Sequence, residues 1–394
     1  MSLRVLSDVQ SFTVFKALEK DKVIRNFYRL LLKEDMESYS DFVSSLYKTG
    51  TDDWTQYLCD KVMSLENCIV KNVCEKKDIP HSIQEALSFE LGILQELSQM
   101  VPDDFKMKGF KASWVTHSVN FESEYYDRLS HIEQFGFGDY ARFTTFRLEL
   151  TGQEPGFVLK PVEYPDPICF SDLIGYDLQR QQVIANTEIL LKGRLASNVL
   201  LYGDAGTGKS ATVKAIANEF SNRGLRLIEL GKKELHLLPK LLDLLAKNPL
   251  KFILFIDDLS FQENDDDFSA LKAVLEGSVS VRSNNTVIYA TSNRRHIVKE
   301  TFQAREGDEI HRNDTMQETI SLSERFGMKV YYEKPKKDLY QEIVFGLADQ
   351  YGLNIDREIL ALKAEQFALR KAGRSARAAR QLIEQLSAQE ENPR

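Results

Sequence analysis

The sequence predicts an α/β fold in its second half, built on a five-stranded parallel sheet, with mainly helical segments before and after it. Between residues 170 and 333, short apolar runs rich in β-branched residues alternate with helical runs. This order is typical of a parallel sheet covered on both faces. A glycine-rich segment ending in Gly-Lys-Ser directly follows the first of these apolar runs. At 394 residues the chain is long enough for two or three domains.

Residues 1–150 are expected to form a mainly helical N-terminal domain. One apolar stripe recurs at i, i+4, i+7 and i+8 from Val23 to Leu31, as on one face of a helix. A capping box from Ser82 to Glu85 predicts the start of another helix, which Pro102 would end.

A proline-rich linker is expected at residues 151–169. Four of the ten prolines lie in the short stretch from Pro155 to Pro167. Proline fixes φ and lacks a backbone N–H, so this density cannot continue a helix and favours an extended connection. We therefore place the α/β domain at residues 170–333 and a small helical lid domain at residues 334–394.

The α/β domain is expected to contain at least three helices between its strands. The strands are Val199–Tyr202, Leu225–Leu230, Phe252–Ile256, Thr286–Thr291 and Met328–Tyr332, and the helices are Ala211–Phe220, Leu235–Leu245 and Phe268–Leu275.

The segment between the first strand and its helix matches the phosphate-binding pattern GxxxxGK[ST]. Its residues are Gly203, Asp204, Ala205, Gly206, Thr207, Gly208, Lys209 and Ser210. The glycines let backbone N–H groups face phosphate oxygens, and the following helix directs the positive end of its dipole at them. We expect Lys209 to neutralise the β- and γ-phosphates and Ser210 to offer its hydroxyl to Mg²⁺. The sequence therefore predicts a P-loop nucleotide site.

Two acids, Asp257 and Asp258, end the third predicted strand. Ligands bind at the carboxyl ends of parallel strands, so we expect both acids beside the P-loop. Asp257 is expected to bind Mg²⁺, and Asp258 to orient or deprotonate the attacking water. The alternative is a pair of helix N-cap residues after a core strand.

With a strand that ends in Thr-Ser-Asn and a later Arg-Phe-Gly, these segments resemble the AAA+ ATPase superfamily over roughly residues 170–390. The strings IDDLSF, LKAVLEGS, YATSNRRH, REGDEIH and SLSERFG resemble more narrowly the bacterial AAA+ family of unknown function catalogued as DUF815. The resemblance implies hydrolysis of ATP to ADP and phosphate with Mg²⁺. It also implies that hydrolysis drives a conformational change in a homo-oligomer acting on an unknown macromolecule, such as a protein partner.

The resemblance assigns roles to two residues beyond the acids. Asn293 matches sensor 1, which holds the attacking water, and Arg325 matches the arginine finger, which reaches a neighbouring subunit. Most members of the superfamily end the acidic strand in Asp-Glu, whereas this chain has the shorter Asp258. The shorter reach favours an alternative function, a nucleotide-gated binding module with little turnover.

Further positions carry over to the lid and to the base of the nucleotide. Arg377 matches sensor 2 on a C-terminal helix, with Arg374 and Arg380 as neighbouring alternatives. Ile174 and Tyr176 match the segment that packs around adenine.

Composition limits the remaining function classes. The net charge of -8 argues against a nucleic-acid binder, although the basic run at residues 370–380 leaves a DNA-associated loader or remodeller as a third alternative. The four cysteines show no metal-ligand spacing, which favours reduced thiols and a cytoplasmic location. We find no apolar stretch of membrane-spanning or signal-peptide length, and expect no membrane partner.

Overall fold

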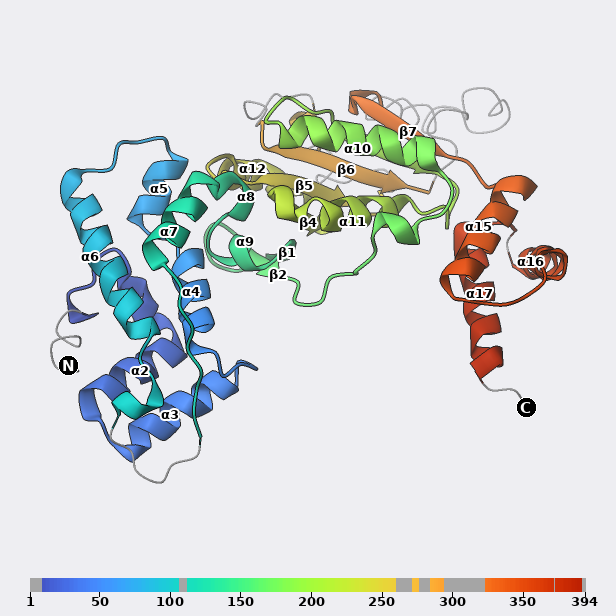
Figure 1. Cartoon of the computed structure of the whole chain (residues 1–394). Helices are drawn as coiled ribbons and strands as arrows, with labels where there is room; N and C mark the ends of the chain where they lie inside the picture. The colour runs from blue at the N-terminus through green and yellow to red at the C-terminus, as the bar shows by residue number, and fades with distance from the viewer. Residues whose placement is uncertain are drawn as a thin grey trace. The chain divides into compact units, whose positions relative to one another are not determined.

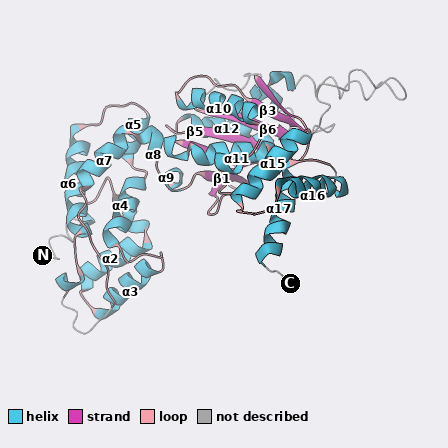
Figure 2. Cartoon of the chain, turned by 45° about the vertical axis from the view of Figure 1, so that its right-hand side comes forward, coloured by secondary structure: helices cyan, strands magenta, loops and turns pink. Residues whose placement is uncertain are grey.

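The structure is a computed structural model that describes residues 9–105, 112–259, 271–275, 284–293, 323–371 and 373–391. The chain divides into two compact units, residues 1–142 and 143–394 (Figure 1). Helices dominate the described part of the first unit, while the second combines strands with helices (Figure 2). The α/β fold class predicted for the second half is confirmed.

The first unit is mainly helical around an aromatic core. Its helices are η1 (Lys16–Lys20), α2 (Lys22–Lys33), α3 (Met36–Tyr47), α4 (Trp54–Ser64), α5 (Cys68–Cys74), α6 (His81–Ser98), η2 (Pro102–Asp104), α7 (Phe121–Ser130), α8 (Ile132–Phe135) and α9 (Asp139–Arg142). The apolar stripe of α2 is buried as expected, and Phe27 on it packs within 4.3 Å of Trp54, centroid to centroid. The predicted capping box is wrong, because α6 begins at His81 after Pro80 and no side chain caps it.

The described residues of the second unit form one seven-stranded sheet. Its strands are β1 (Thr145–Leu150), β2 (Phe157–Pro161), β3 (Val199–Gly203), β4 (Leu225–Leu230), β5 (Lys251–Ile256), β6 (Thr286–Ser292) and β7 (Met328–Tyr332), in the order β2-β1-β4-β5-β6-β3-β7. All neighbouring strands pair in parallel except β1 and β2, which are antiparallel. The five strands expected from the sequence are β3 to β7, and β6 lies between the P-loop strand β3 and the acidic strand β5.

The structure differs from the expected boundary at residues 151–169. Strand β1 lies in the segment assigned to the helical domain, and β2 lies in the segment assigned to the linker. Both belong to the sheet, since β1 pairs with β4. An edge strand tolerates proline because one side of its backbone needs no partner. Pro161 is the last residue of β2, at the edge of the sheet.

Helices cover both faces of the sheet. These helices are η3 (Phe170–Asp172), α10 (Asp177–Leu191), α11 (Lys209–Glu219), η4 (Ser221–Arg223), η5 (Lys232–Leu237) and α12 (Leu238–Ala246). Alternate strand residues such as Leu201 and Ile253 share one core with α10 and α11. Their neighbours Leu200 and Leu254 are buried on the opposite face, and α12 contacts β6. Of the helix predicted at Phe268–Leu275, residues 271–275 are helical and the remainder lies outside the described residues.

Three helices form the lid at the C-terminal end of the second unit, coloured orange to red in Figure 1. They are α15 (Lys337–Gln350), α16 (Arg357–Arg370) and α17 (Ala376–Glu391). Their apolar faces share the core that includes α10 and α11.

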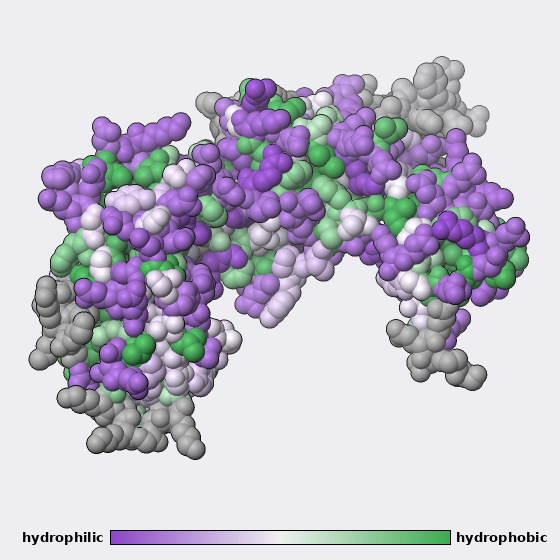
Figure 3. Space-filling view, viewed as in Figure 1, coloured by the Kyte–Doolittle hydropathy of each residue, from purple (hydrophilic) through white to green (hydrophobic). Residues whose placement is uncertain are grey.

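Hydrophilic residues cover much of the face shown in Figure 3, with smaller apolar patches between them. Within the described ranges, no helix is both long and apolar enough to cross a membrane.

Candidate nucleotide site

The P-loop connects β3 to α11 and is built on glycines with positive φ. Gly203, Gly206 and Gly208 have φ angles of 130°, 76° and 94°, a region that glycine enters at little cost. At Gly203 a side chain would also collide with the carbonyl oxygen of Tyr332. The next N–H, that of Asp204, donates to the same oxygen over 3.0 Å. The loop is therefore fixed against the carboxyl end of β7.

Lys209 lies at the start of α11 and is almost fully buried, with 5% of its surface exposed. Its ammonium group donates to the carbonyl oxygens of Asp204 over 2.6 Å and Gly203 over 3.3 Å. Burial lowers the pKa of Lys209 to about 8, although the nearby carboxylates of Asp204, Asp257 and Asp258 oppose the shift. Lys209 is thus a buried lysine whose charged form an anionic ligand would stabilise.

The two acids follow β5 in a tight turn beside the P-loop. Oδ1 of Asp257 accepts hydrogen bonds of 2.6 Å from both Ser210 and Thr291. Asp258 has a φ of 51°, which is uncommon for a residue with a side chain and is found often at functional sites. Its Oδ1 accepts a hydrogen bond of 2.8 Å from the side-chain amide of Asn293. The sequence prediction that these groups lie together agrees with the observed geometry.

A cavity of about 450 Å³ extends from the P-loop to the lid. One end is apolar and is lined by Ile174 together with Ile343 and Leu347 of α15. Tyr176 also lines it, and its hydroxyl donates to the carbonyl oxygen of Glu333 over 2.7 Å. The cavity therefore joins a polar end at the P-loop to an apolar end beside α15.

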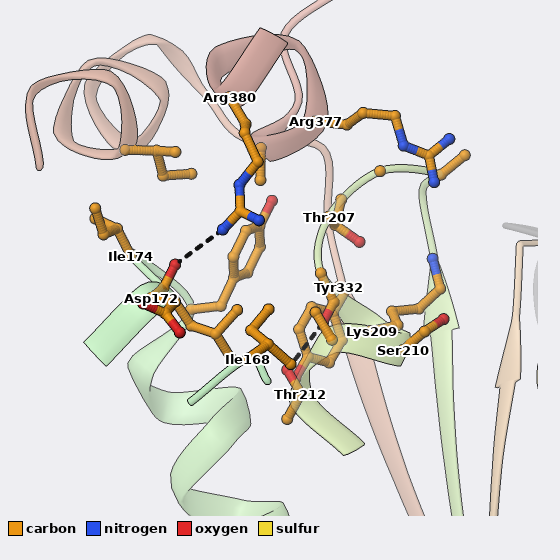
Figure 4. Close-up of a pocket in the computed structure, with 18 of the residues that line it drawn as sticks. Ile168, Asp172, Ile174, Thr207, Lys209, Ser210, Thr212, Tyr332, Arg377 and Arg380 are labelled. Carbon is orange, nitrogen blue, oxygen red and sulfur yellow. Dashed lines mark hydrogen bonds between the residues drawn. The ribbon is translucent and has the colours of Figure 1, made fainter. Parts of the chain in front are cut away.

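Tyr176, Tyr332 and Thr212 line the cavity, and Tyr332 contacts the other two. The rings of Tyr176 and Tyr332 lie 5.3 Å apart, centroid to centroid. The hydroxyl groups of Tyr332 and Thr212 are hydrogen-bonded at 3.1 Å (Figure 4). The end of β7 thus contacts the P-loop helix and the expected base segment.

The three lid arginines have different surroundings in the structure. Arg374 forms a bidentate ion pair with Glu365 of α16, with its shortest contact at 2.8 Å, and does not line the cavity. Arg380 lines the cavity and donates to the backbone carbonyl oxygen of Asp172 over 3.4 Å. Figure 4 shows Arg377 extending towards the side where Lys209 and Ser210 lie. Arg377 is thus the lid arginine that extends towards the polar end of the cavity.

The backbone of Arg377 also touches the P-loop. Its N–H donates to the carbonyl oxygen of Gly206 over 3.1 Å. A side chain at Gly206 would crowd Cβ of Arg377 at 3.2 Å and Oγ of Ser375 at 3.3 Å. The lid and the P-loop are therefore in direct contact.

Arg325 lies elsewhere in the unit. It precedes β7 and is half-buried. It is not among the described residues that line the cavity of its own chain. The string REGDEIH, at residues 305–311, lies outside the described residues.

A family model described as "Protein of unknown function (DUF815)" matches residues 141–390, which is most of the chain and almost all of the second unit. The chain belongs to this DUF815 family. The resemblance to this family, expected from the sequence, is confirmed.

A search of curated proteins matched the 26S proteasome regulatory subunit 6B homolog of Schizosaccharomyces pombe. The two are 34% identical over 116 residues, which cover 26% of this chain and 30% of that protein. The match thus spans less than a third of the relative's length.

Among solved structures, the matches include the Thermotoga maritima RuvB Holliday junction branch migration motor. The identity is 15%, the match covers 56% of this chain and 65% of that chain, and the TM-score is 0.39. A variant of the same RuvB protein matches at 16% identity over 56% of this chain and 66% of that chain, again with a TM-score of 0.39.

The DUF815 domain also places residues at the site that the sequence analysis did not select. Thr291 contacts Asp257, Tyr332 contacts the P-loop, and Ile343 and Leu347 reach the cavity from the lid. Thr291 stands at the end of a predicted strand, and Met328–Tyr332 was also predicted as a strand. The sequence therefore marked Thr291 and Tyr332 as residues at strand ends. Selecting them as site residues also requires knowing that both strands lie next to the P-loop strand.

Proposed function

We propose that this chain binds ATP with Mg²⁺ and hydrolyses it to ADP and phosphate. The observation that carries the proposal is the hydrogen bond of 2.6 Å between Ser210 of the P-loop helix and Asp257 of the acidic turn. It joins the two groups expected to hold Mg²⁺, beside the buried cation of Lys209. A hydroxyl and a carboxylate in contact next to a glycine-rich loop suit a metal-bound triphosphate.

The cavity fits the parts of ATP. The P-loop glycines leave the backbone open to phosphate oxygens, and Lys209 supplies positive charge at the same end. The apolar end, lined by Ile174, Ile343 and Leu347, suits a purine ring. The volume of about 450 Å³ lies in the usual range for small-molecule sites.

The groups around Asp257 fit Mg²⁺. Mg²⁺ at nucleotide sites commonly takes one or two protein oxygens and completes its shell with phosphate and water. Ser210 and Asp257 are the residues that would hold it. When bound, the ion would neutralise charge on the phosphates as the transferring bond breaks.

Asp258 and Asn293 are the groups proposed to position the attacking water. Their hydrogen bond of 2.8 Å places a carboxylate and an amide together at the carboxyl ends of β5 and β6. The carboxylate would accept a proton from the water, while the amide would hold its orientation. Arg377 would stabilise charge from the lid side.

We further propose that the chain works as a homo-oligomer on a protein partner. The position of Arg325 outside its own cavity supports a role at a neighbouring subunit's site. The curated relative, named as a proteasome regulatory subunit, also supports assembly with other chains.

The experiment compares Lys209→Ala and Asp257→Asn with Lys214→Ala, which changes another lysine of the same helix that faces Asp166. Lys209→Ala should lose ATP affinity in calorimetry. Asp257→Asn should lose turnover and the Mg²⁺ dependence of binding, while Lys214→Ala should behave as the native chain. Unchanged ATP affinity and turnover in Lys209→Ala would contradict the proposal.

A second candidate is a nucleotide-gated binding module with little turnover. The short side chain of Asp258 and its engagement by Asn293 favour it. Steady-state phosphate release by the native protein distinguishes the two. Slow release with tight ATP binding would support the module, and release at tens of turnovers per second, on the order of typical enzymes, would exclude it.

The DNA-associated alternative loses its main support. In the basic run at residues 370–380, Arg374 pairs with Glu365, and Arg377 and Arg380 line the cavity. The ammonium group of Lys371 lies over the ring of Phe367. Salt-dependent DNA binding remains the test of this alternative.

A further inference from the structure

Thr291 occupies the strand that separates the P-loop strand from the acidic strand. On one side of β6, Thr291 is paired in register with Leu201 of β3. On the other side, Ala290 is paired with Ile256 of β5, which brings Thr291 level with Asp257. The residue is buried, with 2% of its surface exposed. It is thus the residue of β6 in contact with the acidic turn.

Three hydrogen bonds connect Thr291 to three consecutive residues of that turn. Its hydroxyl donates to Oδ1 of Asp257 over 2.6 Å and accepts from the N–H of Asp258 over 2.9 Å. Its carbonyl oxygen accepts from the N–H of Leu259 over 2.7 Å. Thr291 therefore contacts both the first carboxylate and the backbone that carries the second.

The hydroxyl is the part of Thr291 that selects the orientation of Asp257. The N–H of Asp258 also donates to Oδ1, over 3.1 Å, as does Ser210. Within the described residues, all hydrogen bonds to this carboxylate end on Oδ1, so they hold one rotamer and leave Oδ2 available. The positive φ of Asp258 needs support from its surroundings, and the bond from its N–H to the Thr291 hydroxyl provides it.

We propose that Thr291 is a positioning residue whose hydroxyl aligns Asp257 for Mg²⁺ and holds Asp258 in its positive-φ conformation beside the P-loop. The inference rests on the proposed function, because it assumes the same metal site. Partners that orient a ligating carboxylate typically contribute about 10–100-fold to metal affinity or activity.

The test uses Thr291→Val, which keeps the shape and removes the hydroxyl, and Thr291→Ser, which restores it. The matched control is Thr187→Val, since Thr187 is another buried threonine of this unit whose hydroxyl contacts Tyr289 and Val183 rather than the acids. The readout is the affinity of Mn²⁺ for the ADP-loaded protein, measured by electron paramagnetic resonance. Phosphate release is measured on the same proteins.

We expect Thr291→Val to bind Mn²⁺ about 10–100-fold more weakly while metal-free ADP affinity stays near native. Thr291→Ser should recover most of the loss, and Thr187→Val should show native Mn²⁺ affinity. Native Mn²⁺ affinity in Thr291→Val would overturn the inference. A loss in Thr291→Ser or in Thr187→Val as large as in Thr291→Val would also overturn it, because packing would then be the cause.

The outcomes separate this inference from the proposed function. If the native chain binds Mn²⁺ with ADP but releases no phosphate, hydrolysis is refuted, and the Mn²⁺ affinities of the variants still decide the role of Thr291. If the native chain shows no Mn²⁺ binding with ADP, both proposals fail.

Discussion

The side-chain amide of Asn293 donates a hydrogen bond of 2.8 Å to Oδ1 of Asp258. The two residues stand at the carboxyl ends of neighbouring strands, β6 and β5. The two residues are 35 positions apart in the sequence, and the parallel pairing of β5 with β6 brings them into contact. A carboxylate held in this way has a defined direction without a covalent or metal contact.

Replacing Asp258 should separate binding from hydrolysis. Asp258→Asn keeps the size of the side chain but cannot accept a proton, so ATP should bind normally and phosphate release should fall by about 10²–10⁴-fold. Calorimetry and a phosphate-release assay measure the two effects. Asp243→Asn, an exposed acid of α12, is the control and should be unaffected. Normal hydrolysis by Asp258→Asn would mean that another group serves as the base.

The lid arginines should differ in their effects. Arg377→Ala should lower turnover, because its positive charge lies on the phosphate side of the cavity, and we expect a loss of about 10-fold or more. Arg374→Ala removes an arginine three residues away that is paired with Glu365, so it should lower the melting temperature and leave nucleotide affinity unchanged. A larger loss of turnover in Arg374→Ala than in Arg377→Ala would reverse this assignment.

Nucleotide affinity should fall at alkaline pH. The pKa of Lys209 is lowered to about 8 by burial, so the nucleotide-free protein holds a charged lysine below pH 8 and loses the charge above it. Binding of phosphate favours the charged form, so above pH 8 it requires uptake of a proton, and affinity should decrease by up to about 10-fold per pH unit. Between pH 6.5 and 7.5, about one unit below that pKa, the affinity should change little.

The matched variant for this experiment is Lys209→Arg, since arginine stays charged over the whole range. ADP affinity measured by calorimetry at several pH values should decline above pH 8 in the native chain and remain flat in the variant. An equal decline in both proteins would assign the pH dependence to other groups.

Arg325 should act across a subunit boundary. Arg325→Ala should bind ATP normally and hydrolyse it about 10³–10⁵-fold more slowly, as expected for an arginine finger. Mixing it with Asp258→Asn should restore part of the activity, because mixed oligomers contain sites with an intact finger and an intact acid. Specific activity should also rise with protein concentration where assembly is incomplete. A monomer with constant specific activity and no rescue would exclude the role in trans.

The sequence predicted the central sheet well because parallel strands buried on both faces consist of continuous apolar residues. Strands such as β5 and β6 have this pattern, and the structure buries nearly all of their residues. Strand β1 alternates polar and apolar residues, and β2 ends in a proline. Both lie towards an edge of the sheet, where local pattern alone cannot distinguish a strand from an extended linker.

Some residues of the candidate site could likewise be predicted from local sequence, and others could not. Residues within one contiguous motif, from Gly203 to Ser210, could be selected from the sequence because their chemistry and spacing are local. The role of Thr291 depends on which strand lies beside β5, and the choice among the lid arginines depends on which one Glu365 engages. Both are properties of tertiary contacts, which no local pattern encodes.

The lid holds the P-loop through the main chain, since the N–H of Arg377 donates to the carbonyl oxygen of Gly206. Every amino acid except proline carries that N–H, so the mechanical attachment does not depend on which side chain stands at this position. The charge that the lid presents on the Lys209 side of the cavity does depend on it. Evolution can therefore strengthen, weaken or remove the charge at residue 377 without releasing the lid. Members of this family can therefore keep the same attachment between lid and P-loop while differing in the charge that they carry at this position.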